Sequence, residues 1–404
     1  MMVLEGIKIL ELVHLPPGEL CGMILGDFGA DVIKIEPVPE GKFLKELQTA
    51  GDSKAINIAT AHNALNRNKK SIKLNLKSED GVNIFHKLAK DADVIIEGFR
   101  PGVAKRMGVD YATIRSFNPR VVYCSLSGYG QDGPYSKFPG HDINYISMAG
   151  ALNLIGEAGQ KPAIPLNFLA DFAGAPLHGA LGIMAALFVR QRTGNGQYVD
   201  ISYTDTVITL MTAFLQQYFT DGSKFPRGEW ALSGVYPYYC TYETSDHKLI
   251  SLGCFEPKFW ENLCKVIGRD DLKLFCFRPE HLGKKPDDLR WHDVQEVMRK
   301  TFRTKKRDEW FDILIKHDVP VGKVYAIEEI FTDPQLLHRH MLLELKHPKL
   351  GKVKQPGMAI KLSETPPKFR NFAPYPGEHT DKILKSLGYS KSEIEGFRKF
   401  KGVD

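Results

Sequence analysis

The chain has 404 residues, of which 43% are apolar and 25% are charged, and its formal net charge is +6. This length exceeds what one hydrophobic core usually organises, so two domains are expected. The sequence has no run of about 18 apolar residues, so no membrane span is predicted. Charged residues come early in the chain, which argues against a signal peptide. The basic residues are scattered and lack the dense stripe that is typical of nucleic-acid binding. The composition therefore predicts a cytoplasmic protein with six reduced cysteines, without membrane or nucleic-acid partners.

The first part of the chain alternates predicted strands and helices. Residues 7–13 form an apolar strand, 18–28 have apolar residues at helical spacing with Gly29 placed to end the helix, and 30–37 form a second strand. Strand, helix and strand within about thirty residues make a βαβ unit, which implies a parallel sheet. The alternation predicts an α/β fold with a large, Rossmann-like, doubly wound domain. The pattern recurs at 71–76, 81–92, 93–99 and 121–130.

The second half of the chain has a different character. A largely apolar, alanine-rich segment at 168–190 predicts a buried helix, and 204–222 predict a long helix that leads out of the first domain. Two predicted strands and several helices within 225–330 suggest a smaller α+β domain. A last helical pattern covers 382–400. We expect the large domain over residues 1–222, the small domain over 223–332, and a return to the large domain with a C-terminal helix over 333–404.

Two motifs have the spacing of cofactor or metal sites but lack the required context. The segment GYGQDG at 128–133 matches G-x-G-x-x-G, yet Pro134 follows at once and no helix starts there to meet a pyrophosphate. It predicts instead a flexible loop that shapes a ligand cleft. His338 and His340 have no third ligand nearby, and no C-x-x-C pair occurs, so no metal site is predicted.

Two basic stretches follow or precede predicted strands, where open α/β sheets bind ligands. Lysine and arginine at such positions suit phosphate groups. A solvated basic face explains the same pattern equally well, and both interpretations stay open. The residues are Arg67, Lys69, Lys70, Lys73 and Lys77 in the first stretch and Arg100, Lys105 and Arg106 in the second.

Three separate polar residues are candidates for proton transfer. His141 and Asp142 open a helix in GHDINY, where Asp142 suits a helix cap. Asp171 lies in the apolar stretch PLNFLADFAG, and a carboxylate there needs a partner or a function. Glu256 precedes Pro257 in FEPKFW and suits a first helical turn equally well. Sequence spacing alone does not bring these residues together.

Several long motifs in order resemble the class III coenzyme A transferase (CaiB/BaiF) family, which also contains α-methylacyl-CoA racemases. The motifs are SGYGQDGP, GHDINYIS, PLNFLADFAG, RTGNGQYVD, FEPKFW and GEHTDKILKSLGY. The second, third and fifth resemble the racemase branch. The resemblance implies a large and a small domain in each subunit and two subunits interlocked as a homodimer, or as a heterodimer with a paralogue.

The resemblance also implies an activity and the residues that perform it. It makes His141 and Asp171 two bases that epimerise 2-methyl-branched or related 2-substituted acyl-CoA thioesters through an enolate, with Glu256 orienting the histidine. The alternative is a succinate-type CoA-transferase in which Asp171 is the nucleophile. A third alternative is a non-catalytic acyl-CoA-binding partner subunit. Only Gly228 and Gly234 occupy the region of the glycine run of oxalate-type transferases, which argues against that type.

Coenzyme A is expected as part of the substrate, with no permanently bound cofactor. Pro37 stands where the family has an arginine near the adenosine phosphate, and Lys34 or Arg100 is a candidate to compensate. By resemblance, the positions expected to bind CoA are His14, Leu15, Pro16, Leu74 to Lys77, Gly98, Phe99, Arg100, Arg106, Lys137, Asp142 and Tyr145.

Overall fold

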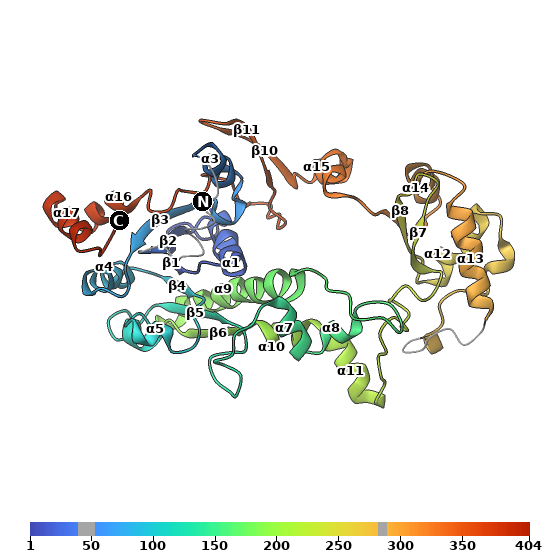
Figure 1. Ribbon diagram of the computed structural model, residues 1–404, viewed down its shortest axis with the longest axis horizontal. Helices are drawn as coiled ribbons and strands as arrows, with labels where there is room; N and C mark the ends of the chain where they lie inside the picture. The colour runs from blue at the N-terminus through green and yellow to red at the C-terminus, as the bar shows by residue number, and fades with distance from the viewer. Residues whose placement is uncertain (39–52, 282–288) are drawn as a thin grey trace. The chain divides into compact units, whose positions relative to one another are not determined.

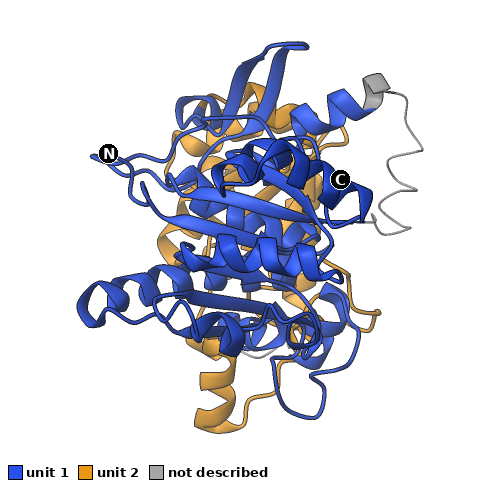
Figure 2. Ribbon diagram, turned by 90° about the vertical axis from the view of Figure 1, so that its left-hand side faces the viewer, with its two compact units in different colours: residues 1–149, 167–210, 335–404 blue, residues 150–166, 211–334 orange. Residues whose placement is uncertain are grey.

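The computed structural model describes residues 1–38, 53–281 and 289–404, and the chain divides into two compact units (Figure 2). Unit 1 comprises residues 1–149, 167–210 and 335–404, and unit 2 comprises residues 150–166 and 211–334. The backbone therefore passes from unit 1 to unit 2 twice and returns twice. All six cysteines are free thiols.

Unit 1 is built on a six-stranded parallel sheet with the order β3-β2-β1-β4-β5-β6 (Figure 1). Leu10 of β1 lies opposite Ile33 of β2 and Ile95 of β4. The inner strands are covered on both faces, which explains their nearly continuous apolar sequences. The sheet confirms the predicted α/β fold. The strands are Lys8–Leu12 (β1), Asp31–Pro37 (β2), Lys69–Leu74 (β3), Val94–Glu97 (β4), Val122–Ser127 (β5) and Tyr198–Ser202 (β6).

Helices cover both faces of this sheet. Helices α1 (Pro16–Asp27) and α9 (Ala175–Thr193) pack against the face that carries Ile9 and Val94. Helix α4 (Glu79–Lys90) and the C-terminal helices pack against the face that carries Leu10. The remaining helical elements of unit 1 are α3 (Ser53–His62), η1 (Ala64–Asn66), α5 (Val103–Arg106), α6 (Tyr111–Arg115), α7 (Asp142–Met148), the π-helix η2 (Phe168–Gly174), α10 (Tyr203–Leu210), α16 (Thr380–Ser386) and α17 (Lys391–Lys399), and a hairpin pairs β10 (Leu342–His347) with β11 (Gly351–Pro356).

Unit 2 has a small antiparallel sheet and an aromatic core. Its strands β7 (Tyr239–Glu243), β8 (Leu249–Gly253) and β9 (Val321–Lys323) follow one another in the sheet. Tyr236 and Tyr238 stack with ring centroids 5.1 Å apart. The described helical elements of this unit are α8 (Ala151–Leu154), α11 (Thr212–Asp221), α12 (Pro257–Val266), η3 (Asp270–Leu272), η4 (Pro279–His281), α13 (Arg290–Phe302), α14 (Arg307–Ile315) and η5 (Ile327–Thr332). Helix α15 (Pro334–His338) begins at the last residue of unit 2 and continues in unit 1.

Two predicted helices are each divided into two. The helix expected over 204–222 breaks at Met211, whose φ of −90° and ψ of 8° leave the helical region where the chain passes from unit 1 to unit 2. The C-terminal helix is interrupted because Gly388 adopts a φ of +87°. Ser390 then caps the next helix by accepting a hydrogen bond from the N–H of Glu393.

One helical stretch, residues 168–193, is long and apolar enough to cross a membrane when only its length and composition are considered. A buried core helix has the same composition. In this structure Ala180, Ile183 and Leu187 of α9 pack into the hydrophobic cluster beneath the sheet.

Candidate functional site

The strand order of unit 1 creates a topological switch point between β1 and β4. From β1 the chain winds outward to β2 and β3, and from β4 it winds in the opposite direction, so the loops after β1 and β4 separate at this point. Ligands of open α/β sheets bind at such carboxyl ends. His14 follows β1 and Phe99 follows β4, and their ring centroids are 6.4 Å apart. The predicted CoA residues Leu15, Gly98 and Arg100 belong to the same two loops and are exposed, as is Pro16, the first residue of α1.

The loop after β4 is held by a buried carboxyl group that the sequence interpretation missed. Glu97 is 3% exposed, and its Oε2 accepts a hydrogen bond of 2.7 Å from the N–H of Phe99. Its other oxygen accepts from the hydroxyl of Ser125, which also accepts from the Tyr198 hydroxyl at 2.9 Å. Burial raises the pKa of Glu97 to about 7. Glu97 is the last residue of the apolar strand VIIE, and a carboxyl group at the end of an apolar strand was the only sign in the sequence that Glu97 is buried.

Glycine at position 98 is required by close packing. A Cβ atom there would lie 2.6 Å from Cγ1 of Val13, so a larger residue would separate the two loops. His14, next to Val13, has its pKa lowered to about 4, first by burial and then by the nearby Lys34 ammonium. The ring is therefore neutral near pH 7, with Nδ1 at 4.0 Å from Glu36 Oε2.

The first basic stretch is mostly structural, which corrects its interpretation as a phosphate site or a solvated face. Lys69 is 2% exposed, and its ammonium donates to Glu11 Oε1 at 2.8 Å and to Asn66 Oδ1 at 3.1 Å. Arg67 is fully buried against Asp27. These cations are bound within the core because burying an unpaired charge would be costly.

Three other lysines of the sequence analysis are also paired. Lys70 forms an ion pair with Asp31 at 2.7 Å, and Lys73 with Asp404 at 2.7 Å. Lys34, considered as a replacement for the missing arginine, is 5% exposed and pairs with Glu19 and Glu36. It is therefore unavailable to a phosphate, which corrects that expectation.

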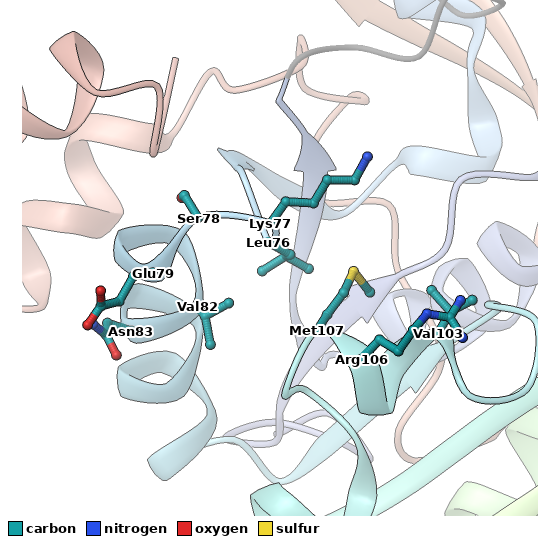
Figure 3. A pocket seen from close by; sticks show the side chains of 9 residues that line it. All are labelled: Leu76, Lys77, Ser78, Glu79, Val82, Asn83, Val103, Arg106 and Met107. Carbon is teal, nitrogen blue, oxygen red and sulfur yellow. The ribbon is translucent and has the colours of Figure 1, made fainter.

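Lys77 and Arg106 line one groove of about 530 Å³ beside β3 (Figure 3). Lys77 comes from the loop before α4 and Arg106 from α5, and both side chains are exposed. Leu76 and Met107 supply apolar surface between them. Leu74, by contrast, is 1% exposed and belongs to the hydrophobic core, so its side chain does not face this groove.

The structure brings the segments of His141 and Asp171 together. Asp142 is buried, and its Oδ2 accepts hydrogen bonds from the backbone N–H groups of Ala170 at 2.8 Å and Asp171 at 2.9 Å. The capping role expected for Asp142 at its own helix is thus performed for the π-helix that carries Asp171. His141 is exposed, and its backbone N–H donates to Asn144 Oδ1 at 3.1 Å.

The environment of Asp171 favours its protonated form relative to a free carboxyl group. Partial burial raises the pKa of Asp171, the Asn167 amide opposes this by donating to Oδ2 at 3.2 Å, and the negative charge of Asp142 raises the pKa further. His141 interacts electrostatically with Asp171 in the opposite direction. A half-buried carboxyl group with a raised pKa, close to a histidine, suits proton transfer.

Tyr145 connects this pair to the switch point. Its hydroxyl donates to the carbonyl of Gly140 at 2.6 Å. Burial raises the pKa of Tyr145 to about 12, Asp171 adds to this increase, and Arg100 opposes it. A Cβ at Gly128 would lie 2.6 Å from Tyr145 Cε1, so the first glycine of GYGQDG admits the tyrosine ring.

Two further predicted residues belong to other segments of the chain. Lys137 is exposed in the loop before α7. Glu256 belongs to unit 2, where it is exposed and directly precedes α12. Within residues 1–38, 53–281 and 289–404, the structure contains no group of three histidine, cysteine or acidic side chains that could hold a metal ion.

Comparisons with known proteins place the chain among CoA enzymes. The model of CoA-transferase family III matches residues 4–380. The α-methylacyl-CoA racemase of Mus musculus is 35% identical over 97% of this chain and 95% of that protein. The succinyl-CoA:glutarate CoA-transferase of Mus musculus is 31% identical over 98% of this chain and 89% of that protein. The crystal structure of a CaiB/BaiF family protein from Brucella suis superposes with a TM-score of 0.80, 28% identity, and coverage of 96% and 99%.

Proposed function

The chain belongs to CoA-transferase family III, and we propose that it is an enzyme that epimerises 2-methyl-branched or related 2-substituted acyl-CoA thioesters. The observation that carries the proposal is the Asp142 carboxylate, which binds the backbone of Asp171 while its neighbour His141 interacts with the Asp171 side chain. The likeness to a racemase over nearly the whole chain supports the same assignment.

The proposed reaction uses His141 and Asp171 as two bases. A thioester acidifies its α-carbon only partly, so one base must remove the α-proton while the enzyme stabilises an enolate. If the second base returns a proton to the opposite face, the configuration at carbon 2 is inverted. Each base has to accept a proton in one direction and donate it in the other. The raised pKa of Asp171 brings its two protonation states closer in energy near neutral pH.

We propose that CoA binds along the carboxyl edge of the unit 1 sheet. His14, Gly98 and Arg100 at the switch point would meet the pantetheine arm, and Lys77 and Arg106 would meet phosphate groups in their groove. Both side chains are exposed; Lys77 follows the end of β3 and Arg106 follows the end of β4 along the chain, at the edge where open α/β sheets bind ligands. Lys137, on the loop before α7, is a further candidate contact.

The alternative is CoA transfer between carboxylic acids, with Asp171 as the nucleophile. Asp171 would attack the thioester carbonyl to form a mixed anhydride and release the CoA thiolate. The thiolate would then attack the Asp171 carbonyl of the anhydride, which breaks the anhydride bond, releases the donor carboxylate and leaves an aspartyl-CoA thioester for the acceptor carboxylate to attack. The likeness to a succinyl-CoA:glutarate CoA-transferase favours this candidate. In this reaction His141 would be dispensable, and in the racemase it would not. A non-catalytic partner subunit would need neither residue.

The deciding experiment is incubation of the full chain with a single epimer of a 2-methylacyl-CoA in D2O, without an acceptor acid. Deuterium entry at carbon 2 together with loss of stereochemical purity supports the epimerase. His141→Ala should abolish the exchange, and His338→Ala, an exposed histidine outside the site, should leave it unchanged. Full exchange in His141→Ala would contradict the two-base reaction. CoA transfer to added succinate, with a hydroxylamine-sensitive intermediate at Asp171, would establish the transferase.

We further propose that the enzyme is a dimer. Helix α9 carries a row of exposed apolar side chains at helical spacing: Leu177 is 48% exposed, Leu181 67% and Phe188 55%. An uncovered apolar row of this kind marks an association surface. Sedimentation of the wild type should give a dimer, and Leu181→Lys should shift it toward monomer. A monomeric wild type would refute the proposal, and mixed chains in the native complex would indicate a heterodimer.

Two further expectations belong to this proposal. Glu256 is proposed to orient the catalytic histidine, so Glu256→Gln should lower kcat more than it changes KM. The enzyme is proposed to be cytoplasmic, which fractionation of cells that express the tagged chain would test.

A further inference from the structure

A separate cavity of about 350 Å³ lies at the edge of the unit 1 sheet where the strands begin. Its walls come from the first residues of β1, β2 and β3, the end of α4, and α16. The proposed CoA site occupies the other edge, because parallel strands all end there. With five residues in β1, and a rise of about 3.3 Å per residue, the two edges are roughly 16 Å apart. The cavity volume is in the lower part of the range for small-molecule sites.

The floor of the cavity is apolar and rigid. Leu10 and Ile383 are 2% and 5% exposed and belong to the hydrophobic core of unit 1. Ile33, Leu88 and Leu387 pack against the same core and complete the floor. A ligand with an apolar part would cover these side chains at little conformational cost, because the core already fixes them.

The rim of the cavity is cationic, with four lysines against two aspartates, Asp31 and Asp91. Lys70 is paired with Asp31, and the Lys87 ammonium lies over the Tyr389 ring at 3.9 Å. The other two lysines, Lys8 and Lys382, form no ion pair with any residue in the described part of the chain, and both are exposed. These two ammonium groups are therefore available to an anion.

His379 adds a neutral donor to this rim. Its Nδ1 accepts a hydrogen bond of 3.3 Å from the N–H of Ser71, so the proton of the neutral ring lies on Nε2. Partial burial lowers the pKa of His379, and the charges of Lys382 and Lys70 act in the same direction, whereas Glu378 and Asp31 oppose them. The ring therefore stays uncharged near neutral pH and can donate one hydrogen bond to an anion.

We propose that this cavity is a second ligand site, which binds a carboxylate that carries a short apolar chain. Lys8 and Lys382 bind the carboxylate, His379 donates from Nε2, and the chain covers the floor formed by Leu10 and Ile383. A bare anion leaves the floor in contact with water, and a neutral apolar molecule leaves the lysines unused. Because the site is distant from the switch point, the carboxylate and CoA bind at the same time.

Isothermal titration of the full chain with hexanoate at low salt tests this site. We expect saturable binding, with inorganic phosphate and hexanol each at least about tenfold weaker, since each supplies only one of the two contacts. Lys8→Gln and Lys382→Gln should each weaken hexanoate about threefold, as for a partly exposed ion pair. Lys385→Gln changes an exposed lysine of the same helix that does not line the cavity, and it should bind like the wild type.

Three results would overturn the proposal. The first is equal affinity for phosphate and hexanoate. The second is unchanged hexanoate binding in a Lys8→Gln/Lys382→Gln double variant whose thermal stability equals that of the wild type. The third is loss of hexanoate binding in the presence of saturating CoA. The last would mean that hexanoate binds at the thioester site. Since catalysis is not measured, a failure of the proposed epimerase reaction leaves this test unaffected.

Discussion

Asp142→Asn should weaken both the stability of unit 1 and the catalytic step, because the Asp142 carboxylate holds the backbone that carries Asp171. Its Oδ2 accepts two backbone hydrogen bonds, at 2.8 Å from Ala170 and 2.9 Å from Asp171. Hydrogen bonds to a charged group contribute about 1.5–3 kcal/mol each and are roughly twice as strong as neutral ones. An asparagine that keeps both contacts should therefore lower the free energy of unfolding by about 2 kcal/mol.

The pH dependence of the rate separates this positioning role from a purely structural one. The negative charge of Asp142 raises the pKa of Asp171, so its removal should lower that pKa and move the acid limb of the rate profile to lower pH. We expect kcat to fall about 10- to 100-fold, because small displacements of a reacting group cost that much. Asp132→Asn, an exposed aspartate in the preceding loop, is the control. Wild-type kcat with an unmoved acid limb in Asp142→Asn would refute the reasoning.

Three further variants test the buried groups around the site. Burial raises the pKa of Glu97 from 4.5 to about 7, so the folded state binds an extra proton and stability should fall as pH rises through this window, by up to about 3 kcal/mol. Urea unfolding of Glu97→Gln should lack that fall. Lys69→Met leaves Glu11 buried without its partner and should lower the free energy of unfolding by about 3–5 kcal/mol. Adding Glu11→Leu should restore much of that stability, and an equal loss in the double variant would contradict this explanation. Gly128→Ala should displace the Tyr145 ring and lower kcat and the free energy of unfolding, the latter by about 1–3 kcal/mol. The control Gly396→Ala, in open space within α17, should leave kcat unchanged and raise stability slightly, because alanine is the better helix former.

The parallel sheet was predictable because its signals are local. Two apolar strands, a helix with apolar residues at helical spacing, and Gly29, with a φ of +109°, all follow one another within the first βαβ unit. The burial and the partners of the lysines were not predictable in this way. Lys69 finds Glu11 at a separation of 58 residues, so no window of the sequence contains both partners. The same holds for Asp142 and the π-helix, which are 28 residues apart.

Asp171 alone does not distinguish the two proposed reactions, because one environment suits both. Partial burial makes its carboxylate a stronger base, and the same partial desolvation makes it a better nucleophile toward a thioester. The difference lies in what stands on the other side of the reacting carbon. A nucleophile needs only access to the carbonyl, whereas inversion at carbon 2 needs a second base. His141 is exposed beside Asp171, and the buried Asp142 fixes the relative position of the two segments. A transferase needs the positioned aspartate but not a second base, so the histidine, and not the aspartate, is the residue whose replacement distinguishes the two proposed reactions.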